Sequence, residues 1–314
     1  MDYLDFKRLS LIIPAWNGDQ FIGPCLASLQ QHAPSDMDLE IIVIDNGSTD
    51  QTVSCVRQFP QIRLVCNNRN LGFARAVNQG LHAATGQVLI LLNQDIVAKA
   101  NWVQPLLEQL EQDVTIGIVG SKLLYPDGSV QHAGGYLVDP AREGRHFLDD
   151  NPNNRIDFVT GAAFTIRRAC WLATGDFDES FSPAYFEDVD YCLRAKQFGW
   201  NIGYAAKSVL IHYESQSRGA NFDHAANFHM QRFRFVLKHQ SYESIIHDFL
   251  PYERKRVIHA PNQDFILRYA IAHICIHHML RIEQFGYRFS QEQLRMLIDE
   301  LLSLRQLSLK QAIQ

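Results

Sequence analysis

Short runs of β-branched and leucine residues alternate with longer amphipathic segments over about the first 120 residues. The strand-like runs lie at residues 9–13, 39–44, 62–65 and 88–92, and helical periodicity is found at about 20–32, 50–59 and 72–85. Gly86 stands in the usual position after a helix. Alternation of this kind is typical of βαβ units, so it predicts an α/β fold with a mostly parallel central sheet flanked by helices.

The pattern changes between about residues 117 and 165. The apolar runs become shorter there, and turn residues appear at 126–128 and at 134–135. Smaller, partly antiparallel strands are therefore expected. The segment at 142–154 is charged and rich in Asn and Pro, which favours a loop. Three further elements are predicted before residue 219: helices near 167–174 and 188–198, and a strand near 208–212.

The last third of the chain has no β-type runs. Ser290 and Gln293 have the spacing of a capping box, and four leucines at 3-4-3 spacing follow on one helical face: Leu294, Leu297, Leu301 and Leu304. This face is consistent with packing in the fold and with a homodimer contact. We predict an α/β domain over residues 1–219 and a helical extension over 220–314.

Composition and charge narrow the functional class. The net charge is −5, from 29 Lys and Arg against 34 Asp and Glu, and no run of five like charges occurs, so general nucleic-acid binding is excluded. The six cysteines form no CxxC pair, which favours reduced thiols in the cytoplasm. No apolar run approaches the ~20 residues that span a bilayer, and no signal peptide is recognisable. Membrane contact is therefore expected to be peripheral, at the inner face.

Polar motifs follow three of the predicted strands, at residues 14–17, 45–50 and 93–95. Ligands of open α/β sheets bind at the carboxyl ends of the strands, so these motifs are expected to converge on one site. Asp45 can accept hydrogen bonds from a ribose or a base, and Gly47 lets the backbone approach closely. Asp95 is placed where a hard cation would be held beside phosphate oxygens. Each motif also has a plain interpretation as a turn or helix cap.

A second acidic group, Glu187-Asp188-Val189-Asp190, begins a predicted helix. The helix dipole favours acids in a first turn, so a cap is one interpretation. The preceding residues 175–179 and 185–186 are rich in acidic and aromatic side chains, which is typical of a sugar site with a general base. His212 ends a short apolar run, and a lone histidine there is most often structural.

Two features of the C-terminal third remain open. Phenylalanines and basic residues between 228 and 238 are consistent with contact to a membrane that carries a lipid-linked acceptor, or with a packed helix. His273, Cys275, His277 and His278 are close in sequence, but no HExxH pattern is present, so a metal there is not predicted.

Five motifs, in their order and spacing, resemble the inverting glycosyltransferases of family 2. They are Pro14-Ala15-Trp16-Asn17, residues 44–50 (IDNGSTD), residues 70–74 (NLGFA), Asn93-Gln94-Asp95 and residues 186–190 (FEDVD). The similarity covers about residues 9–219 and is closest to the rhamnosyltransferase-like branch. It implies an A-type glycosyltransferase fold, to which the C-terminal helical extension is added.

The resemblance also implies roles for individual residues. A nucleotide-sugar donor would be bound by residues of the first four motifs: Pro14, Ala15, Asn17, Asp45, Asn46, Asn70, Gly72 and Asn93. Asp95 would meet Mg²⁺ or Mn²⁺ at the donor diphosphate, and His212 lies where many relatives place a histidine that helps to bind metal or diphosphate. Glu187 and Asp188 would supply the catalytic base, for which Asp188 is favoured. Many relatives have a second aspartate where this chain has Asn93, which puts metal dependence in question.

The predicted function is therefore inverting transfer of a sugar from dTDP-rhamnose or a UDP-sugar to a hydroxyl of a glycan or lipid-linked acceptor, in polysaccharide biosynthesis. The alternative is a catalytically degenerate scaffold or glycan-binding module. A nucleotidyltransferase would need a basic glycine-rich loop after the first strand, and a dehydrogenase would need GxGxxG there. Residues 14–18 match neither.

Overall fold

The computed structural model describes residue 6 and residues 8–140, 142–151, 155–214, 224–259 and 290–311. The chain divides into two compact units. The first unit comprises Met1–Tyr136, Gly144–Pro183 and Glu187–Ala220, and the second comprises Leu137–Glu143, Ala184–Phe186 and Asn221–Gln314. The predicted domain boundary at residues 219 and 220 lies outside the described residues.

The βαβ pattern predicted for the N-terminal part is confirmed. It consists of β1 (Arg8–Ala15), α1 (Asp19–Gln31), β2 (Asp38–Asp45), α2 (Thr52–Val56), β3 (Arg63–Cys66), α3 (Phe73–Ala83) and β4 (Val88–Leu92). The chain continues through β5 (Ile96–Ala98), α4 (Gln104–Gln112), β6 (Ile116–Leu124), β7 (Val130–His132), β8 (Gly135–Val138), β9 (Glu143–His146) and β10 (Ala163–Arg167). Then follow α5 (Arg168–Thr174), a 3-10 turn (Glu179–Phe181), α6 (Glu187–Gln197) and β11 (Asn201–His212).

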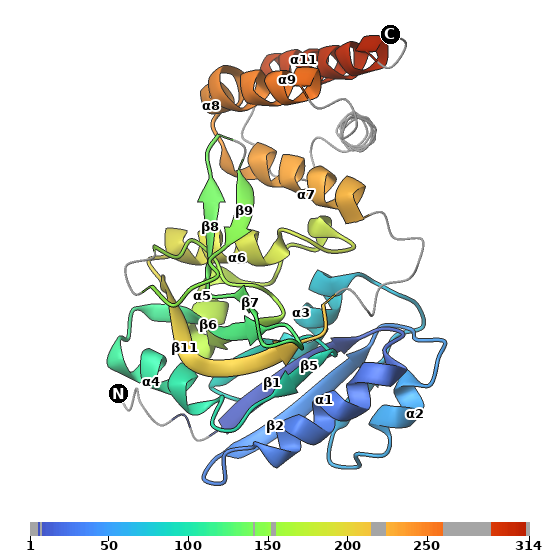
Figure 1. Cartoon of the computed structure of the whole chain (residues 1–314), viewed down its shortest axis with the longest axis vertical. Coiled ribbons are helices and arrows are strands. Elements are labelled where there is room, and N and C mark those ends of the chain that lie inside the picture. The colour runs from blue at the N-terminus through green and yellow to red at the C-terminus, as the bar shows by residue number, and fades with distance from the viewer. Residues whose placement is uncertain are drawn as a thin grey trace. The chain divides into compact units, whose positions relative to one another are not determined.

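One sheet organises the first unit (Figure 1). Its strand order is β3-β2-β1-β4-β10-β6-β11-β5, and β7 pairs with β6. The β3-β2-β1-β4 part is parallel, as is the pair β6 and β11. By contrast, β10 is antiparallel to both neighbours, and β5 and β7 are antiparallel to theirs. The predicted α/β fold is thus present, with a mixed sheet because short strands after residue 95 reverse direction.

Helices cover both faces of the sheet. Leu9, Leu11 and Ile13 of β1 join the main hydrophobic core, to which α1 and α4 contribute. Ile12 points to the other face, where it meets α3 so closely that a Cβ on Gly80 would lie 2.2 Å from its Cγ2. In Figure 1, α1 and α2 lie in front of β1 and β2. This alternation is the period-2 pattern of a strand buried on both sides.

Gly86 does not end the third helix, as the sequence suggested. α3 ends at Ala83, and Ala84 is already extended. The Gly86 amide donates to Ser10 Oγ at 2.7 Å, and a Cβ at Gly86 would lie 2.7 Å from the Ser10 nitrogen. The glycine is therefore required for close approach to β1. α2 is also shorter than expected, since it ends at Val56.

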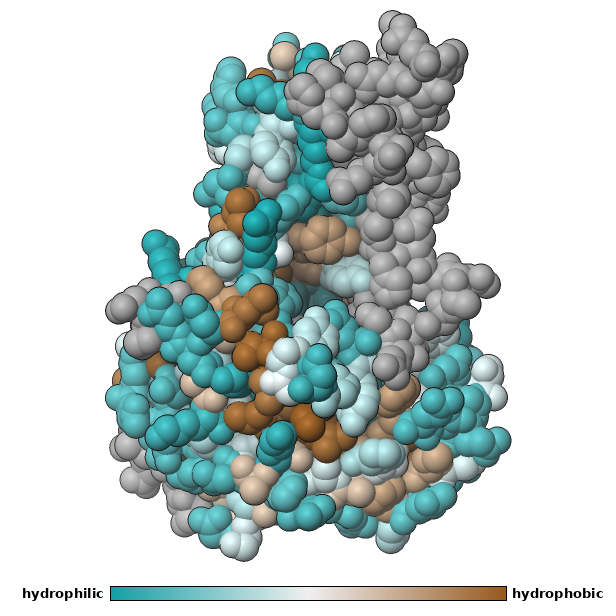
Figure 2. All heavy atoms as spheres, viewed as in Figure 1, coloured by the Kyte–Doolittle hydropathy of each residue, from teal (hydrophilic) through white to brown (hydrophobic). Residues whose placement is uncertain are grey.

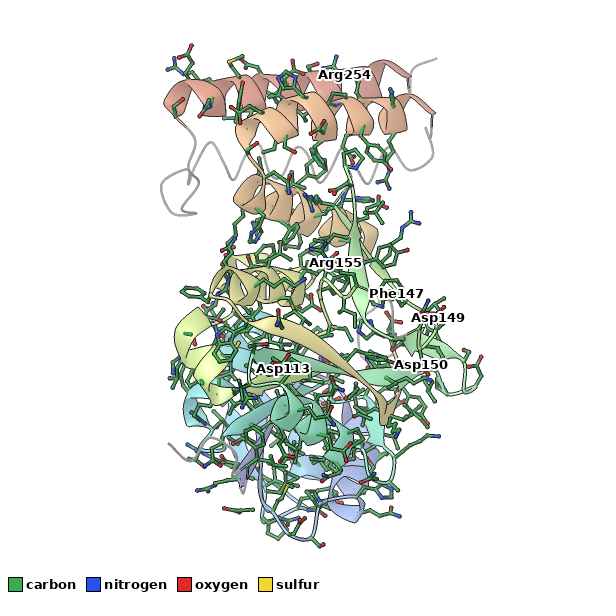
Figure 3. All side chains as sticks on the ribbon, turned by 90° about the vertical axis from the view of Figure 1, so that its left-hand side faces the viewer. Asp113, Phe147, Asp149, Asp150, Arg155 and Arg254 are labelled. Carbon is green, nitrogen blue, oxygen red and sulfur yellow. The ribbon has the colours of Figure 1, made fainter. Side chains whose placement is uncertain are left out.

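The segment predicted as a loop at 142–154 contains β9, which pairs with β8 in a two-stranded sheet. After β9 the chain passes Phe147, Asp149 and Asp150, which lie near one another in Figure 3. The Asp150 carboxylate accepts hydrogen bonds from Lys122 Nζ and, at 2.7 Å, from the Tyr204 hydroxyl. Burial raises the pKa of Asp150, but these two donors outweigh it and lower the pKa. The segment is thereby tied to β6 and β11.

The second unit contains α7 (His224–His239), α8 (Tyr242–Ser244), a π-helical turn (Ile245–Phe249), α9 (Leu250–His259) and α11 (Gln291–Gln311). The capping box before α11 is present, with the Ser290 amide bonded to Gln293 Oε1 at 2.9 Å and the Gln293 amide bonded to Ser290 Oγ at 3.2 Å. Leu297 and Leu301 pack in a core of the second unit together with Phe233. That part of the leucine face is therefore covered within the unit.

The stretch at 228–238 buries three of the side chains considered for membrane contact. Arg232, Phe233 and Phe235 are buried, and Arg232 Nη2 lies 2.8 Å from Glu253 Oε1. The His273, Cys275, His277 and His278 group lies outside the described residues. No helix in the described part of the chain is long and apolar enough to cross a membrane. Figure 2 shows a first unit with a largely hydrophilic face and a band of hydrophobic atoms over β7 and β11.

Candidate active site

The segments that follow β1 and β2 are held together by hydrogen bonds. The Asn17 amide donates to Ser48 Oγ at 2.9 Å, and Asn17 Oδ1 accepts from the Thr49 amide at 2.8 Å. The Gly18 amide donates to Thr52 Oγ1 at 2.8 Å. The first two motifs therefore meet at the carboxyl end of the sheet, as predicted. Asn17, which has a φ of 45°, is fixed in this unusual conformation by its two partners.

Asp45 is a buried carboxylate at the end of β2. It is 2% exposed, and its Oδ2 accepts from the Ser48 amide at 3.2 Å. Its Oδ1 is buried and has no hydrogen-bond partner among the described residues. Pro14 and Ala15 lie alongside, because Ala15 pairs with Asp45 in the β1–β2 register. A buried oxygen without a donor costs free energy, so this atom is suited to a ligand that brings an N–H or O–H group.

Asn46 uses its side chain to position the loop that contains Asn70 and Gly72. Its Nδ2 donates to Asn70 Oδ1 at 2.9 Å and to the Gly72 carbonyl at 3.2 Å, while its Oδ1 accepts from the Leu71 amide at 3.0 Å. Asn70 Oδ1 also accepts from the Gly72 amide at 2.9 Å. Asn46 thus joins the third motif in the chain, residues 70–74, to the second.

Gln94 connects the segment after β4 to the segment after β1. The Trp16 amide donates to Gln94 Oε1 at 3.0 Å, and Gln94 Nε2 donates to the Trp16 carbonyl at 3.0 Å. Sequence reasoning placed Gln94 in a motif but gave it no role. The only signal was a glutamine at the end of an otherwise apolar strand, where burial of its amide requires two partners.

Asp95 and His212 form a buried carboxylate–imidazole pair. Asp95 Oδ1 and His212 Nε2 are 3.2 Å apart, and the side chains are 3% and 8% exposed. Asn93 Nδ2 lies 3.2 Å from the same nitrogen. The pairing of β11 with β5, in which His212 is opposite Ile96, brings these residues together. The arrangement was predicted only through the resemblance, because 117 residues separate the two along the chain.

Carboxylate oxygen and imidazole nitrogen are ligands that Mn²⁺ accepts, and Mg²⁺ sites often use few protein ligands. No group of three or more His, Cys, Asp and Glu side chains suited to a metal occurs in the described part of the chain. Asp95 and His212 together offer two ligand atoms, so a cation held there would take its other ligands from a bound substrate or from water. The side-chain amide of Asn93 faces the imidazole of His212.

Asp188, in the first turn of α6, has a carboxylate that is held by two backbone amides. Its Oδ2 accepts from the Gly161 amide at 2.8 Å, and its Oδ1 accepts from the Val189 amide at 2.8 Å. Burial raises the pKa of Asp188, and the raise persists although both amides and the charge of His146 lower it. A carboxylate with a raised pKa is a stronger base. Glu187, its neighbour in the first turn of α6, is buried.

A three-residue segment connects this carboxylate to the Asp95 motif. The Gly161 amide binds Asp188, and the carbonyl of Ala162 accepts from the Asn93 amide at 3.1 Å. The two acidic motifs are therefore held by the backbone of two adjacent residues, Gly161 and Ala162. Sequence reasoning noted the Gly161-Ala162-Ala163 segment but did not see that it joins them.

The start of α6 is anchored by a buried ion pair that sequence reasoning missed. Arg194 Nε lies 2.8 Å from Asp190 Oδ2, and Asp190 is fully buried. The same guanidinium donates to the carbonyls of Thr174 and Asp176, at 2.9 and 2.8 Å. The signal in the sequence was an acid and an arginine four residues apart. Gln131 of β7 was also missed, and its Oε1 lies 2.7 Å from His212 Nδ1.

The mixed sheet with helices on both faces is similar to the A-type fold of glycosyltransferases. A solved structure of GalNAc-T7 with UDP, GalNAc and Mn²⁺ aligns with a TM-score of 0.64 at 18% identity, over 82% of this chain and 52% of that one. The mannosyltransferase PcManGT from Pyrobaculum calidifontis, solved with GDP-Man and Mn²⁺, aligns with a TM-score of 0.52 at 18% identity, over 97% and 86%. At such identities these similarities show the fold.

Residues 10–171 match the family model described as Glycosyl transferase family 2. The chain belongs to this family.

Two relatives have informative names. The N-acetylglucosaminyl-diphospho-decaprenol L-rhamnosyltransferase of Mycobacterium tuberculosis is 26% identical over 69% of this chain and 80% of its own length. The O-antigen biosynthesis protein RfbC of Myxococcus xanthus is 30% identical over 68% of this chain. The alignment covers only 18% of RfbC, and 22% of an uncharacterized Sinorhizobium fredii relative.

Proposed function

We propose that this chain is an inverting glycosyltransferase of polysaccharide biosynthesis. The donor is dTDP-rhamnose or a UDP-sugar, and the acceptor is a hydroxyl of a glycan or of a lipid-linked saccharide at the inner face of the membrane. The observation that carries the proposal is that Asp188 and the Asn93-Gln94-Asp95 motif bind the backbone of adjacent residues, namely the Gly161 amide and the Ala162 carbonyl. The printed names of the rhamnosyltransferase and O-antigen relatives support the substrate class.

The donor nucleotide would lie over the ends of β1 and β2. Asp45 Oδ1, buried and without a donor among the described residues, would accept a hydrogen bond from the base or ribose. Pro14, Ala15 and Asn17 form the neighbouring backbone at the end of β1. Asn46 acts by holding the loop of Asn70 and Gly72 in place.

Asp95 and His212 would hold Mg²⁺ or Mn²⁺ beside the donor diphosphate. When bound, the cation supplies neutralisation of the negative charge that develops on the leaving nucleotide diphosphate. The side-chain amide of Asn93 contacts His212 and brings no charge, so Asp95 would be the single carboxylate ligand of the cation.

Asp188 would accept the proton of the acceptor hydroxyl. The acceptor oxygen forms a bond to the anomeric carbon of the donor sugar while the bond from that carbon to the diphosphate oxygen breaks, and the proton passes to the Asp188 carboxylate. One displacement from the opposite face inverts the anomeric centre. Glu187 would remain beside it as a second buried acid of the same helix turn.

The test is a panel of dTDP-rhamnose, UDP-glucose, UDP-galactose, UDP-N-acetylglucosamine and GDP-mannose, assayed for binding and slow hydrolysis with and without Mg²⁺ or Mn²⁺. We expect one donor to bind in a metal-dependent manner and Asp95→Ala to weaken that binding. Asp188→Asn should retain binding and lose turnover by roughly 10²-fold or more. Asp113→Asn serves as control, because Asp113 (labelled in Figure 3) bonds Thr115 at the opposite end of the sheet.

Failure of every donor to bind would contradict the proposal and would favour a scaffold or glycan-binding role. Equal turnover in Asp188→Asn and wild type would remove Asp188 as the base while leaving the transferase assignment intact.

A further inference from the structure

Gln131 is a buried polar residue of the short strand β7, and nothing in the proposed mechanism uses it. It is 7% exposed. Its Oε1 lies 2.7 Å from His212 Nδ1, and its Nε2 donates to Glu214 Oε2 at 3.1 Å. The side-chain amide of Gln131 therefore bridges His212 and Glu214.

We propose that Gln131 is a positioning residue for the metal site: it fixes the imidazole of His212 in the tautomer that carries its proton on Nδ1. The lone pair of Nε2 is then directed toward Asp95, where a cation would bind. This inference rests on the proposed function of His212 as a metal ligand.

The direction of each hydrogen bond follows from Glu214. The amide nitrogen of Gln131 donates to Glu214 Oε2, so its amide oxygen faces His212 Nδ1. Nδ1 of His212 must then donate. The Tyr125 hydroxyl, 3.4 Å from the same Glu214 Oε2, adds a second donor to this carboxylate. The amide of Asn93 is consistent with the same tautomer, because its Nδ2 can only donate to His212 Nε2.

Strand pairing explains why Gln131 and His212 meet. In β6, Leu123 pairs with His132 of β7 on one side and with Leu210 of β11 on the other. Gln131 and His212 therefore both lie near the same end of β6. The residues are 81 positions apart in the chain, so the contact is not visible in the sequence.

The tautomer matters because a metal binds only an unprotonated ring nitrogen. A histidine without a partner on Nδ1 is free to place its proton on Nε2, and that form must rearrange before it can bind a cation. Hydrogen-bond partners of this kind change metal affinity by about 10- to 100-fold when they are removed. We expect the same range for Gln131.

The test compares three variants of the full chain. Gln131→Met keeps the approximate size and removes the acceptor. The double variant Gln131→Glu/Glu214→Gln exchanges the two groups, so that a carboxylate accepts from Nδ1 and an amide donates to that carboxylate. Ser129→Ala is the control, because Ser129 belongs to the same hairpin and its hydroxyl donates to Asp127 Oδ1, away from His212.

Two quantities are measured. The ¹⁵N shifts of the His212 ring in metal-free protein at pH 8, assigned by comparison with His212→Ala, report the tautomer. Electron paramagnetic resonance of free Mn²⁺ reports the affinity for the metal alone. We expect a proton on Nδ1 in wild type, a mixture in Gln131→Met with an affinity about 10- to 100-fold lower, and recovery of both in the double variant.

A proton on Nε2 in metal-free wild type, or an unchanged tautomer in Gln131→Met, would overturn the inference. If Gln131→Met does not fold, the double variant Gln131→Glu/Glu214→Gln decides the question. Loss of the proton from His212 Nδ1 in that variant would overturn the inference, and retention of the proton would support it. The proposed function fails in a different way, namely when His212→Ala binds Mn²⁺ as well as wild type does.

Discussion

Nε2 of His212 and Oδ1 of Asp95 face each other at 3.2 Å, both almost fully buried. An equally simple pair, His82 Nε2 and Asp176 Oδ2, is 2.8 Å apart but has side chains that are 61% and 42% exposed. The Asp95–His212 pair is shielded from solvent and places a carboxylate oxygen and an imidazole nitrogen side by side at the strand ends. The second lies on the surface, where water competes for both groups.

This contrast gives the first prediction. His212→Gln should lower Mn²⁺ affinity by more than about tenfold, because the change removes the imidazole nitrogen that we propose as ligand. His82→Gln should leave the affinity unchanged. Titration calorimetry with Mn²⁺ checks both variants, and an equal effect of the two would speak against a site at Asp95 and His212.

The second prediction concerns pH. The pKa of Asp188 is raised above its ordinary value of 3.8, chiefly by burial, and a base acts only when it is deprotonated. Turnover should therefore fall as the pH is lowered through the raised pKa, and the midpoint of that fall should lie above 3.8. Rates of donor hydrolysis from pH 4 to 8 measure it.

The acidic limb should keep its position in Asp113→Asn, which removes a carboxylate remote from the site. Residual activity of Asp188→Asn should lack that limb. If the limb persists unchanged in Asp188→Asn, another group must be the titrating base.

The third prediction compares two glycines. Gly47 has a φ of 77°, and a Cβ there would lie 2.6 Å from the Cα of Arg69. Gly47→Ala should destabilise the fold by about 1–3 kcal/mol and weaken donor binding, because the turn after Asp45 must shift. Gly23 lies within α1, where a Cβ would meet nothing within 4 Å. Gly23→Ala should stabilise the protein by about 0.5–1 kcal/mol. Urea unfolding measures the stability of both variants. If Gly23→Ala destabilised the protein as much as Gly47→Ala, the positive φ of Gly47 could not be the cause.

The fourth prediction concerns the anchor of α6. Arg194→Met should destabilise the protein by about 3–5 kcal/mol, because it leaves the fully buried Asp190 without its guanidinium. Arg8→Met, which breaks an ion pair with Asp38 whose side chains are 45% and 66% exposed, should cost at most about 1 kcal/mol. Chemical unfolding of both variants provides the comparison. Similar losses in the free energy of unfolding would show that the Arg194–Asp190 pair contributes no more than a solvent-exposed ion pair.

Much of the fold could be predicted from local pattern. The runs at 9–13 and 88–92 are strands because they are apolar and β-branched, and both are now seen as β1 and β4. Turn residues after β2 and β4 mark strand ends correctly. The capping box at Ser290 is purely local, so it was predictable from four residues.

Features that depend on spatial neighbours were missed. Position 86 requires glycine because β1 passes close to its backbone. The rules for helix capping consider only neighbours along the chain, so they do not predict this contact. β9 forms inside a charged segment because β8 provides hydrogen-bond partners that outweigh the unfavourable composition. Arg232 belongs to a basic-aromatic stretch, yet it is buried because Glu253 lies opposite.

Local sequence pattern is enough to set the order of the elements in the βαβ region and to place Asp45, Asp95 and Asp188 at strand or helix ends, since periodicity and turn chemistry act over a few residues. The surroundings of these acids depend on how the chain folds in three dimensions. The pairing of Asp95 with His212, the peptide groups of Gly161 and Ala162, and the contact of Gln131 with His212 all join residues far apart in the chain. Such contacts depend on strand order and register, which are chosen by the packing of the whole sheet.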